Sequence, residues 1–149
     1  MTSVALTADA ARWTESIRQR LAACTQAGDA RKAEAYAACF TVDGVLELER
    51  ETIEGRAAIL AWMQAPSVIP QPVDGAAPGF ISHHLTTSRI TFSGADMASA
   101  RTYWLVTSAA GLDHNGFYVD SLRREGEDWL IAHRRPKTLW VSPTSLLQG

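Results

Sequence analysis

The sequence predicts an α+β domain in which a curved antiparallel sheet wraps around two or three N-terminal helices, forming a cone with an internal pocket. Helical periodicity runs to about residue 63, and four segments rich in β-branched and aromatic residues follow Phe80. Helices followed by a run of strands are typical of α+β folds. The length of 149 residues fits one domain, residues 1–149.

The N-terminal part predicts three helices. In the first, apolar residues recur at helical spacing up to a stop at Gly28, and Asp29 begins a second helix with its own apolar stripe. A third, short helix is predicted from Arg56 to Met63, after a turn at Asp43-Gly44 and a strand over 45–48. The two apolar stripes are Trp13, Ile17, Leu21 and Cys24, then Ala33, Tyr36, Ala37 and Phe40.

The C-terminal part predicts a meander of long antiparallel strands over 81–92, 97–108, 116–124 and 129–141. Four prolines in the segment 65–80 exclude regular structure there. Such a loop is either the rim of a binding site or a surface insertion without a role. The ends, residues 1–6 and 142–149, are expected to be flexible tails.

Composition and missing motifs exclude several classes of function. The net charge is −2 with no basic patch, which argues against a nucleic-acid ligand, and no apolar run is long enough for a membrane span. Cys24 and Cys39 form no CxxC pair, and no secretory signal is apparent, so a cytoplasmic protein with reduced thiols is expected. We expect no metal and no cofactor, since no metal-ligand spacing and no nucleotide-binding motif occurs.

The adjacent histidines His83 and His84 are the first candidates for chemistry. Neighbours on a strand point to opposite faces. Counting back by twos from Phe92 places His84 on the apolar, inward face, together with the hydroxyl residues Thr86 and Ser88. A bulge would exchange the two histidines, which leaves His83 as the alternative base. A histidine that is merely hydrogen-bonded within the core is the structural alternative.

Three further positions offer polar groups to the interior. Asp29 is either a helix N-cap or a carboxylate that faces the pocket. Tyr118 and Asp120 share one face of their strand, so that a phenol and a carboxylate can project together. Arg134 and Arg135 alternate, and a buried arginine needs a partner, so one of them is expected to meet the pocket or a carboxylate. His114 is placed in a turn, without a role.

Taken together, these segments resemble the SnoaL-like branch of the nuclear-transport-factor-2-like superfamily, from about Ile17 to Val141. The resemblance rests on the order and spacing of five motifs. They are Tyr36 to Gly44, Ile53-Glu54-Gly55-Arg56, His84 to Ser88, Gly116 to Asp120, and Trp129 to Arg135. The branch includes proteins resembling dehydratases of the scytalone and bile-acid types, hexachlorocyclohexane dehydrochlorinase and polyketide cyclases, which need no cofactor.

The resemblance implies a catalytic set of Asp29, His84 and Arg134. Asp29 lies eleven residues before Phe40. Two departures stand out: Cys24 occupies a position where the dehydrochlorinase pattern has lysine, and Ser88 replaces a more usual asparagine. The superfamily also contains binding and assembly modules without catalysis.

We therefore expect a cofactor-independent lyase or isomerase that acts on a small apolar, cyclic or aromatic molecule through a His-Asp dyad. The alternatives are a non-catalytic binding or assembly module and an epoxide-hydrolase-like enzyme that adds water. A homodimer or homotrimer is expected. The residues expected to contact substrate are Tyr36, Trp62, Phe80, Trp104, Phe117, Tyr118, Asp120 and Trp140.

Overall fold

The computed structural model describes residues 8–66, 80–145 and 147. Three helices precede or flank two short strands, and four long strands follow. The elements are α1 (Ala8–Asp29), α2 (Ala33–Ala37), β1 (Phe40–Glu47), β2 (Thr52–Glu54), α3 (Arg56–Gln64), β3 (Ile81–Phe92), β4 (Met97–Ser108), β5 (Gly111–Glu125) and β6 (Asp128–Val141).

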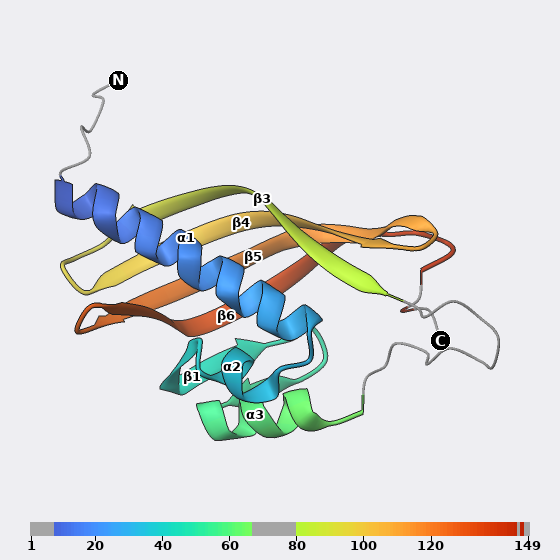
Figure 1. Ribbon diagram of the computed structural model, residues 1–149, viewed down its shortest axis with the longest axis horizontal. Helices are drawn as coiled ribbons and strands as arrows, with labels where there is room; N and C mark the ends of the chain where they lie inside the picture. Colours follow the sequence, from blue (N-terminus) through green and yellow to red (C-terminus); the bar gives the residue numbers. More distant parts are fainter. Residues whose placement is uncertain (1–7, 67–79, 146, 148–149) are drawn as a thin grey trace.

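The strands form one six-stranded sheet in the order β2-β1-β6-β5-β4-β3. β1 pairs in parallel with β6, and every other pairing is antiparallel. α1 lies across one face of the long strands, while α2 and α3 lie beside β1 (Figure 1). We call the face toward α1 the inner face and the opposite one the outer face. This arrangement confirms the predicted α+β fold with a curved sheet.

The core lies between α1 and the inner face. Ile17, Leu21 and Cys24 are buried, as their helical spacing predicts. Near the start of the same helix, Trp13 packs edge-on against Trp129, with ring centroids 6.2 Å apart. No helix in the described part of the chain is long and apolar enough to cross a membrane.

Element bounds differ from the predictions mainly in the N-terminal half and at the start of β5. The Asp43-Gly44 pair is not a free turn but lies within β1, where the register against β6 shifts. β5 begins at Gly111 instead of residue 116. Gly111 already pairs with Ser108 of β4, and only two residues lie between them in the chain. His114 therefore lies on a strand and not in a turn.

A bulge in β3 decides which histidine faces inward. Leu85 pairs with Trp104, but Ser88 pairs with Thr102, so β3 carries one residue more than β4 over this stretch. An extra residue reverses the alternation of faces on one side of the bulge. Counted back from Phe92 toward the start of β3, the residues that face inward therefore include Leu85 and His83, and not His84.

The end of α1 also differs from its prediction. The helix continues through Gly28 to Asp29, so Asp29 does not begin a second helix or serve as its N-cap. The N–H of Lys32 donates to the carbonyl of Ala27, and that of Arg31 to the carbonyl of Gly28. This pattern is a Schellman motif, and its left-handed residue is Arg31, with φ of 56°.

The C-terminal end is not a free tail over its first residues. Ser142 and Ser145 are both buried, and the N–H of Ser142 donates to the carbonyl of Asp113 at 2.7 Å. Residues 1–6 and most of the proline-rich segment 65–80 lie outside the described residues.

Arg31 generates a prediction about stability. Its guanidinium donates to the carbonyls of Met63 and Ala65, each at 2.8 Å, which compensates for a left-handed backbone that favours glycine. Arg31→Ala loses both hydrogen bonds and keeps the strained backbone, whereas Arg31→Gly loses the bonds but relieves the strain. We expect the glycine variant to be more stable than the alanine variant by about 1 kcal/mol, measured by urea unfolding. Equal stability of the two variants would show that the backbone at this position is not strained.

Candidate active site

Asp29 and His83 form a close pair between the end of α1 and the start of β3. The ring Nδ1 of His83 lies 2.6 Å from Oδ1 of Asp29, and the backbone N–H of the same histidine donates to Oδ2 at 2.8 Å. Their side chains are 29% and 20% exposed, so the pair lies in the wall of the domain and remains accessible. One carboxylate thus fixes both the strand and the ring.

The prediction that His84 faces inward beside Asp29 is wrong. Its Nε2 lies 3.2 Å from the hydroxyl of Ser82 and 3.1 Å from that of Thr107, and the residue is exposed. The physical reason is the β3 bulge, which exchanges the two histidines. The alternative, with His83 as the inward histidine, agrees with the geometry.

Arg134 and Asp120 form a second, deeper pair on the inner face. Nε and Nη2 of Arg134 donate to the two carboxylate oxygens of Asp120 at 2.8 and 3.0 Å, and the side chains are only 3% and 0% exposed. The guanidinium also stacks on the ring of Tyr118, 4.0 Å from its centroid. Arg134, and not the exposed Arg135, is therefore the inward arginine.

The groups around this pair are held in defined protonation states. Burial raises the pKa of Tyr118 to about 12, so its hydroxyl remains a neutral donor near pH 7. The pKa of the Cys24 thiol is raised, mainly by a hydrogen bond with Cys39 and to a smaller extent by burial. The sulfur of Cys24 accepts a hydrogen bond from Nη1 of Arg134 at 3.5 Å. Burial by itself lowers the pKa of Arg134, but the neighbouring charges, Asp120 first, raise it well above its ordinary value.

A tryptophan and a third histidine complete the arrangement. The indole of Trp104 lies between three rings, with centroids 6.1 Å from His83, 5.4 Å from His114 and 5.7 Å from Tyr118. Gly116 makes room for it, because a Cβ there would lie 2.7 Å from the indole. We call Asp29, His83, Trp104, His114 and Tyr118 the inner cluster.

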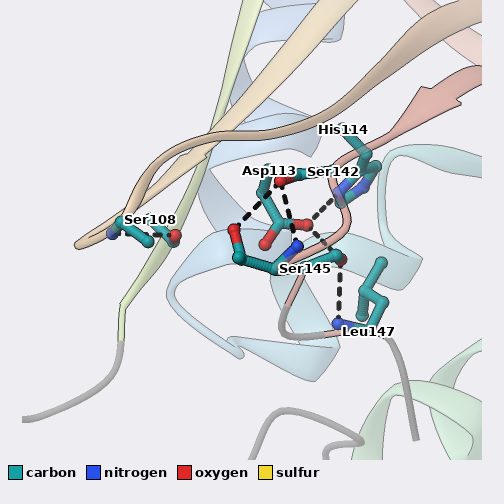
Figure 2. Close-up of polar contacts among 8 residues, drawn as sticks. Ser108, Asp113, His114, Ser142, Ser145 and Leu147 are labelled. Atoms are coloured by element: carbon teal, nitrogen blue, oxygen red, sulfur yellow. Dashed lines mark hydrogen bonds and ion pairs between the residues drawn. The ribbon is translucent and has the colours of Figure 1, made fainter.

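His114 is the functional candidate that the sequence analysis missed. Its Nδ1 lies 2.6 Å from the carboxylate of Asp113, and both residues are buried. Figure 2 shows this pair enclosed by Ser142 and Ser145 of the C-terminal turn. The clue in the sequence was the Asp-His dipeptide, but a strand that starts before Gly116 was needed to bring it to the inner face.

Two of the predicted substrate contacts, Phe117 and Trp140, lie on the outer face. Phe117 packs against Tyr103 and Arg101 on the outer face, because its neighbour Tyr118 occupies the inner one. Trp140 pairs with the outward Asn115 and is exposed. Trp62 donates to Glu51, and Phe80 is exposed. Of the remaining predictions, Tyr36 is buried against Phe40 and Trp62.

A surface hollow of about 460 Å³ lies between α2, α3 and β1, apart from the inner cluster. None of the predicted site residues lines it. Its walls are Glu34, Ala37, Ala38, Val42, Gly55, Arg56, Ala57 and Leu60. Across the described ranges, no three histidine, cysteine or acidic side chains are grouped so that they could hold a metal ion.

This fold, with polar groups gathered on the inner face of a curved sheet, defines a member of the nuclear-transport-factor-2-like superfamily. Within it, the chain belongs to the family of SnoaL-like domains, whose model matches residues 9–135. No functionally curated protein matches the chain.

Solved structures share the fold over most of their length. An NTF2-like protein with a cystatin-like fold from Novosphingobium aromaticivorans is 26% identical, with 99% of this chain and 100% of that one covered and a TM-score of 0.72. A variant of Rv3472 from Mycobacterium tuberculosis, a protein of unknown function, is also 26% identical, with coverage of 92% and 79% and a TM-score of 0.72. A protein provisionally assigned as a scytalone dehydratase, also from N. aromaticivorans, is 18% identical, with coverage of 87% and 85% and a TM-score of 0.72.

The buried Arg134–Asp120 pair generates a prediction about stability. Arg134→Ala leaves the Asp120 carboxylate buried without its cation, which should lower the free energy of unfolding by about 3–5 kcal/mol. Arg123→Ala, which breaks an exposed pair with Asp43, is the matched control and should leave stability unchanged. Urea unfolding measures both. Equal effects of the two variants on the free energy of unfolding would show that the buried Arg134–Asp120 pair contributes no more to stability than an exposed pair.

Proposed function

We propose that the protein is a cofactor-independent acid/base lyase or isomerase, with the Asp29–His83 pair as its dyad and a hydrophobic, ring-containing small molecule as its substrate. The 2.6 Å contact between the carboxylate and Nδ1 of the ring carries this proposal. The family supports it more broadly, since a neighbour in fold is provisionally assigned as a dehydratase.

The dyad geometry suits proton abstraction from carbon. With its Nδ1–H donated to Asp29, the ring of His83 presents the lone pair of Nε2 to a substrate. Among the described residues, no hydrogen bond engages that nitrogen. Nε2 would take the proton from a carbon next to an activating carbonyl, and Asp29 would stabilise the imidazolium that forms.

We assign stabilisation of the negative charge that develops to two neutral donors of the inner cluster. The indole N–H of Trp104 is buried and lacks an acceptor within the described part of the chain, an arrangement that a substrate oxygen would satisfy. The Tyr118 hydroxyl is kept protonated by burial. Arg134 and Asp120 enter the proposal as the pair that positions Tyr118, because protein groups already engage the guanidinium.

The aromatic character of the site supports a ring-shaped substrate. Trp104, Tyr118 and Tyr36 surround the charged pairs on the inner face. Aromatic side chains favour stacked or edge-on contacts with other rings. A polar metabolite such as a sugar phosphate would find few free cations here, since Arg134 is already paired.

The geometry favours proton transfer over water addition. An enzyme that adds water in the manner predicted would need Asp29, Asp120 and Tyr118 to converge on one water molecule. Both oxygens of Asp120 accept from Arg134, and both oxygens of Asp29 accept from His83. Each of these four oxygens thus already contacts a protein N–H group, and we assign the two carboxylates to holding His83 and Arg134 in place.

We further propose a cytoplasmic location. Cys24 and Cys39 are both buried free thiols, which fits a reducing compartment. Fractionation of cells that express the tagged chain would test this.

The two adjacent histidines provide the test of the catalytic proposal. Cyclic ketones that raise the melting temperature are incubated in deuterated water, and exchange of the proton next to the carbonyl is followed by NMR. His83→Ala should slow exchange by about 10²–10⁴-fold, because a positioned base is removed. His84→Ala, the matched control, should retain the rate of the unmodified protein.

Other results would overturn this assignment. If both variants retain exchange, or if no ketone that binds undergoes exchange, the dyad is not a base, and the binding-module alternative gains support. Circular dichroism of each variant establishes that the fold is intact.

We also propose that two copies pair through the outer face. Tyr103 is 43% exposed there, and it packs against Phe117, on which Arg101 stacks at 4.1 Å. An exposed aromatic patch on a sheet is typical of protein contacts. Tyr103→Glu should convert a dimer to a monomer in light scattering, whereas Thr91→Glu, at the rim of the same face, should not. A monomeric unmodified protein, or a trimer unaffected by Tyr103→Glu, would contradict this pairing.

A further inference from the structure

The inner cluster contains a second Asp-His pair that the proposed dyad does not use. The rings of His83 and His114 stand edge to face, with centroids 6.3 Å apart and an interplanar angle of 89°. Each ring binds an aspartate through Nδ1, at 2.6 Å in both cases. Within the described ranges, no hydrogen bond reaches Nε2 of either ring. Two imidazoles thus have a nitrogen available in one small region.

A bulge in β5 explains why Asp113 and His114 are both buried. Val106 pairs with His114 but Thr107 pairs with Leu112, so Asp113 is an extra residue on β5. Consecutive residues of a regular strand face opposite sides, and the bulge removes that constraint. Bulges of this kind are frequent beside active sites because they redirect a side chain.

The turn after β6 closes over this pair. The Ser145 hydroxyl donates to the Asp113 carboxylate at 2.6 Å, and the backbone N–H of Ser142 donates to the Asp113 carbonyl at 2.7 Å (Figure 2). Asp113 therefore joins β5 to the C-terminal turn through both its side chain and its backbone.

We propose that His114 is the second proton-transfer group of the inner cluster, and that Asp113 and Ser145 are the residues that position its ring. The inference rests on the proposed function, and it adds the acid that a base alone does not supply. Elimination of a hydroxyl group needs such an acid, because hydroxide is a poor leaving group unless it is protonated.

The step balances when the two histidines act together on a β-hydroxy carbonyl compound. His83 takes the proton next to the carbonyl, and the electron pair of that C–H bond forms the new C=C bond. The C–O bond breaks with its electron pair on oxygen, which takes the proton from Nε2 of His114 and leaves as water. Proton exchange with solvent then restores a neutral His83 and a protonated His114.

The two histidine-aspartate pairs differ in exposure. The side chains of His114 and Asp113 are 8% and 1% exposed, against 29% and 20% for His83 and Asp29. Because His83 already serves as the base of the proposed dyad, His114 is the ring left to act as the acid.

Two reactions of the full-length protein separate this inference from the proposed function. Proton exchange of a cyclic ketone requires the base, whereas dehydration of a cyclic β-hydroxy ketone requires base and acid. His83→Ala should lower both rates. His114→Gln should lower dehydration by about 10²–10⁴-fold and exchange by a much smaller factor.

The test of Asp113 and Ser145 as positioning residues needs a measurement that would not change if these residues only stabilised the fold. The Nδ1–H of His114 should give an NMR signal that is shifted strongly downfield by its hydrogen bond to Asp113. Ser145→Ala should shift this signal and lower dehydration more than exchange, and Ser145→Thr, which keeps the hydroxyl, should restore both. Thr144→Ala is the matched control, since Thr144 contacts Ser142 and not the carboxylate.

The outcomes are distinguishable. If His83→Ala leaves both reactions intact, the proposed function fails. A second outcome is that His83→Ala abolishes both reactions, while His114→Gln changes neither reaction or lowers both rates equally. In that case the acid role of His114 is wrong and the Asp29–His83 dyad stands. If Ser145→Ala leaves the NMR signal and the ratio of the two rates unchanged, Ser145 does not position the ring.

Discussion

The two hydrogen bonds that the Asp29 carboxylate accepts from His83 connect the helical layer to the sheet. They form because α1 continues to Asp29 before its Schellman turn and because β3 bulges between Leu85 and Ser88, which turns His83 inward. Had the helix ended at Gly28, or had β3 remained regular, the carboxylate would meet a different residue. One contact between distant segments therefore depends on two local irregularities of the backbone.

The three aspartates of the site, one at the end of α1 and two on β5, each have their own partner. Asp29 binds His83, Asp113 binds His114, and Asp120 binds Arg134. Paired in this way, the carboxylates avoid the cost of burial without a counter-charge. The pairing also divides their roles: the guanidinium of Arg134 is permanently charged and stabilises structure, whereas an imidazole has a second ring nitrogen that can take part in proton transfer.

Much of the fold could be predicted from periodicity, and much of the site could not. The α1 stripe and the bounds of β3 and β4 follow from residue spacing alone. His84 was preferred over His83 because counting by twos assumes a regular strand, and the two-against-one pairing at the β3 bulge has no signature in its Thr86-Thr87 sequence. Asp29 resembled an N-cap because the left-handed end of the helix fell on Arg31, where glycine is usual. The site depends on these irregularities more than the fold does.

The same reasoning separates what family membership contributes from what this chain contributes. A SnoaL-like domain provides a curved sheet with an inner face, and that fold also serves modules without chemistry. The features that favour proton transfer here are local: two histidine rings held by carboxylates, an indole N–H without an acceptor in the described residues, and a phenol kept neutral by burial. Because both aspartates are already committed to Nδ1 atoms, the groups left to meet a substrate are neutral donors and imidazole nitrogens. A site of that composition suits moving protons on an uncharged ring compound better than it suits binding a charged one.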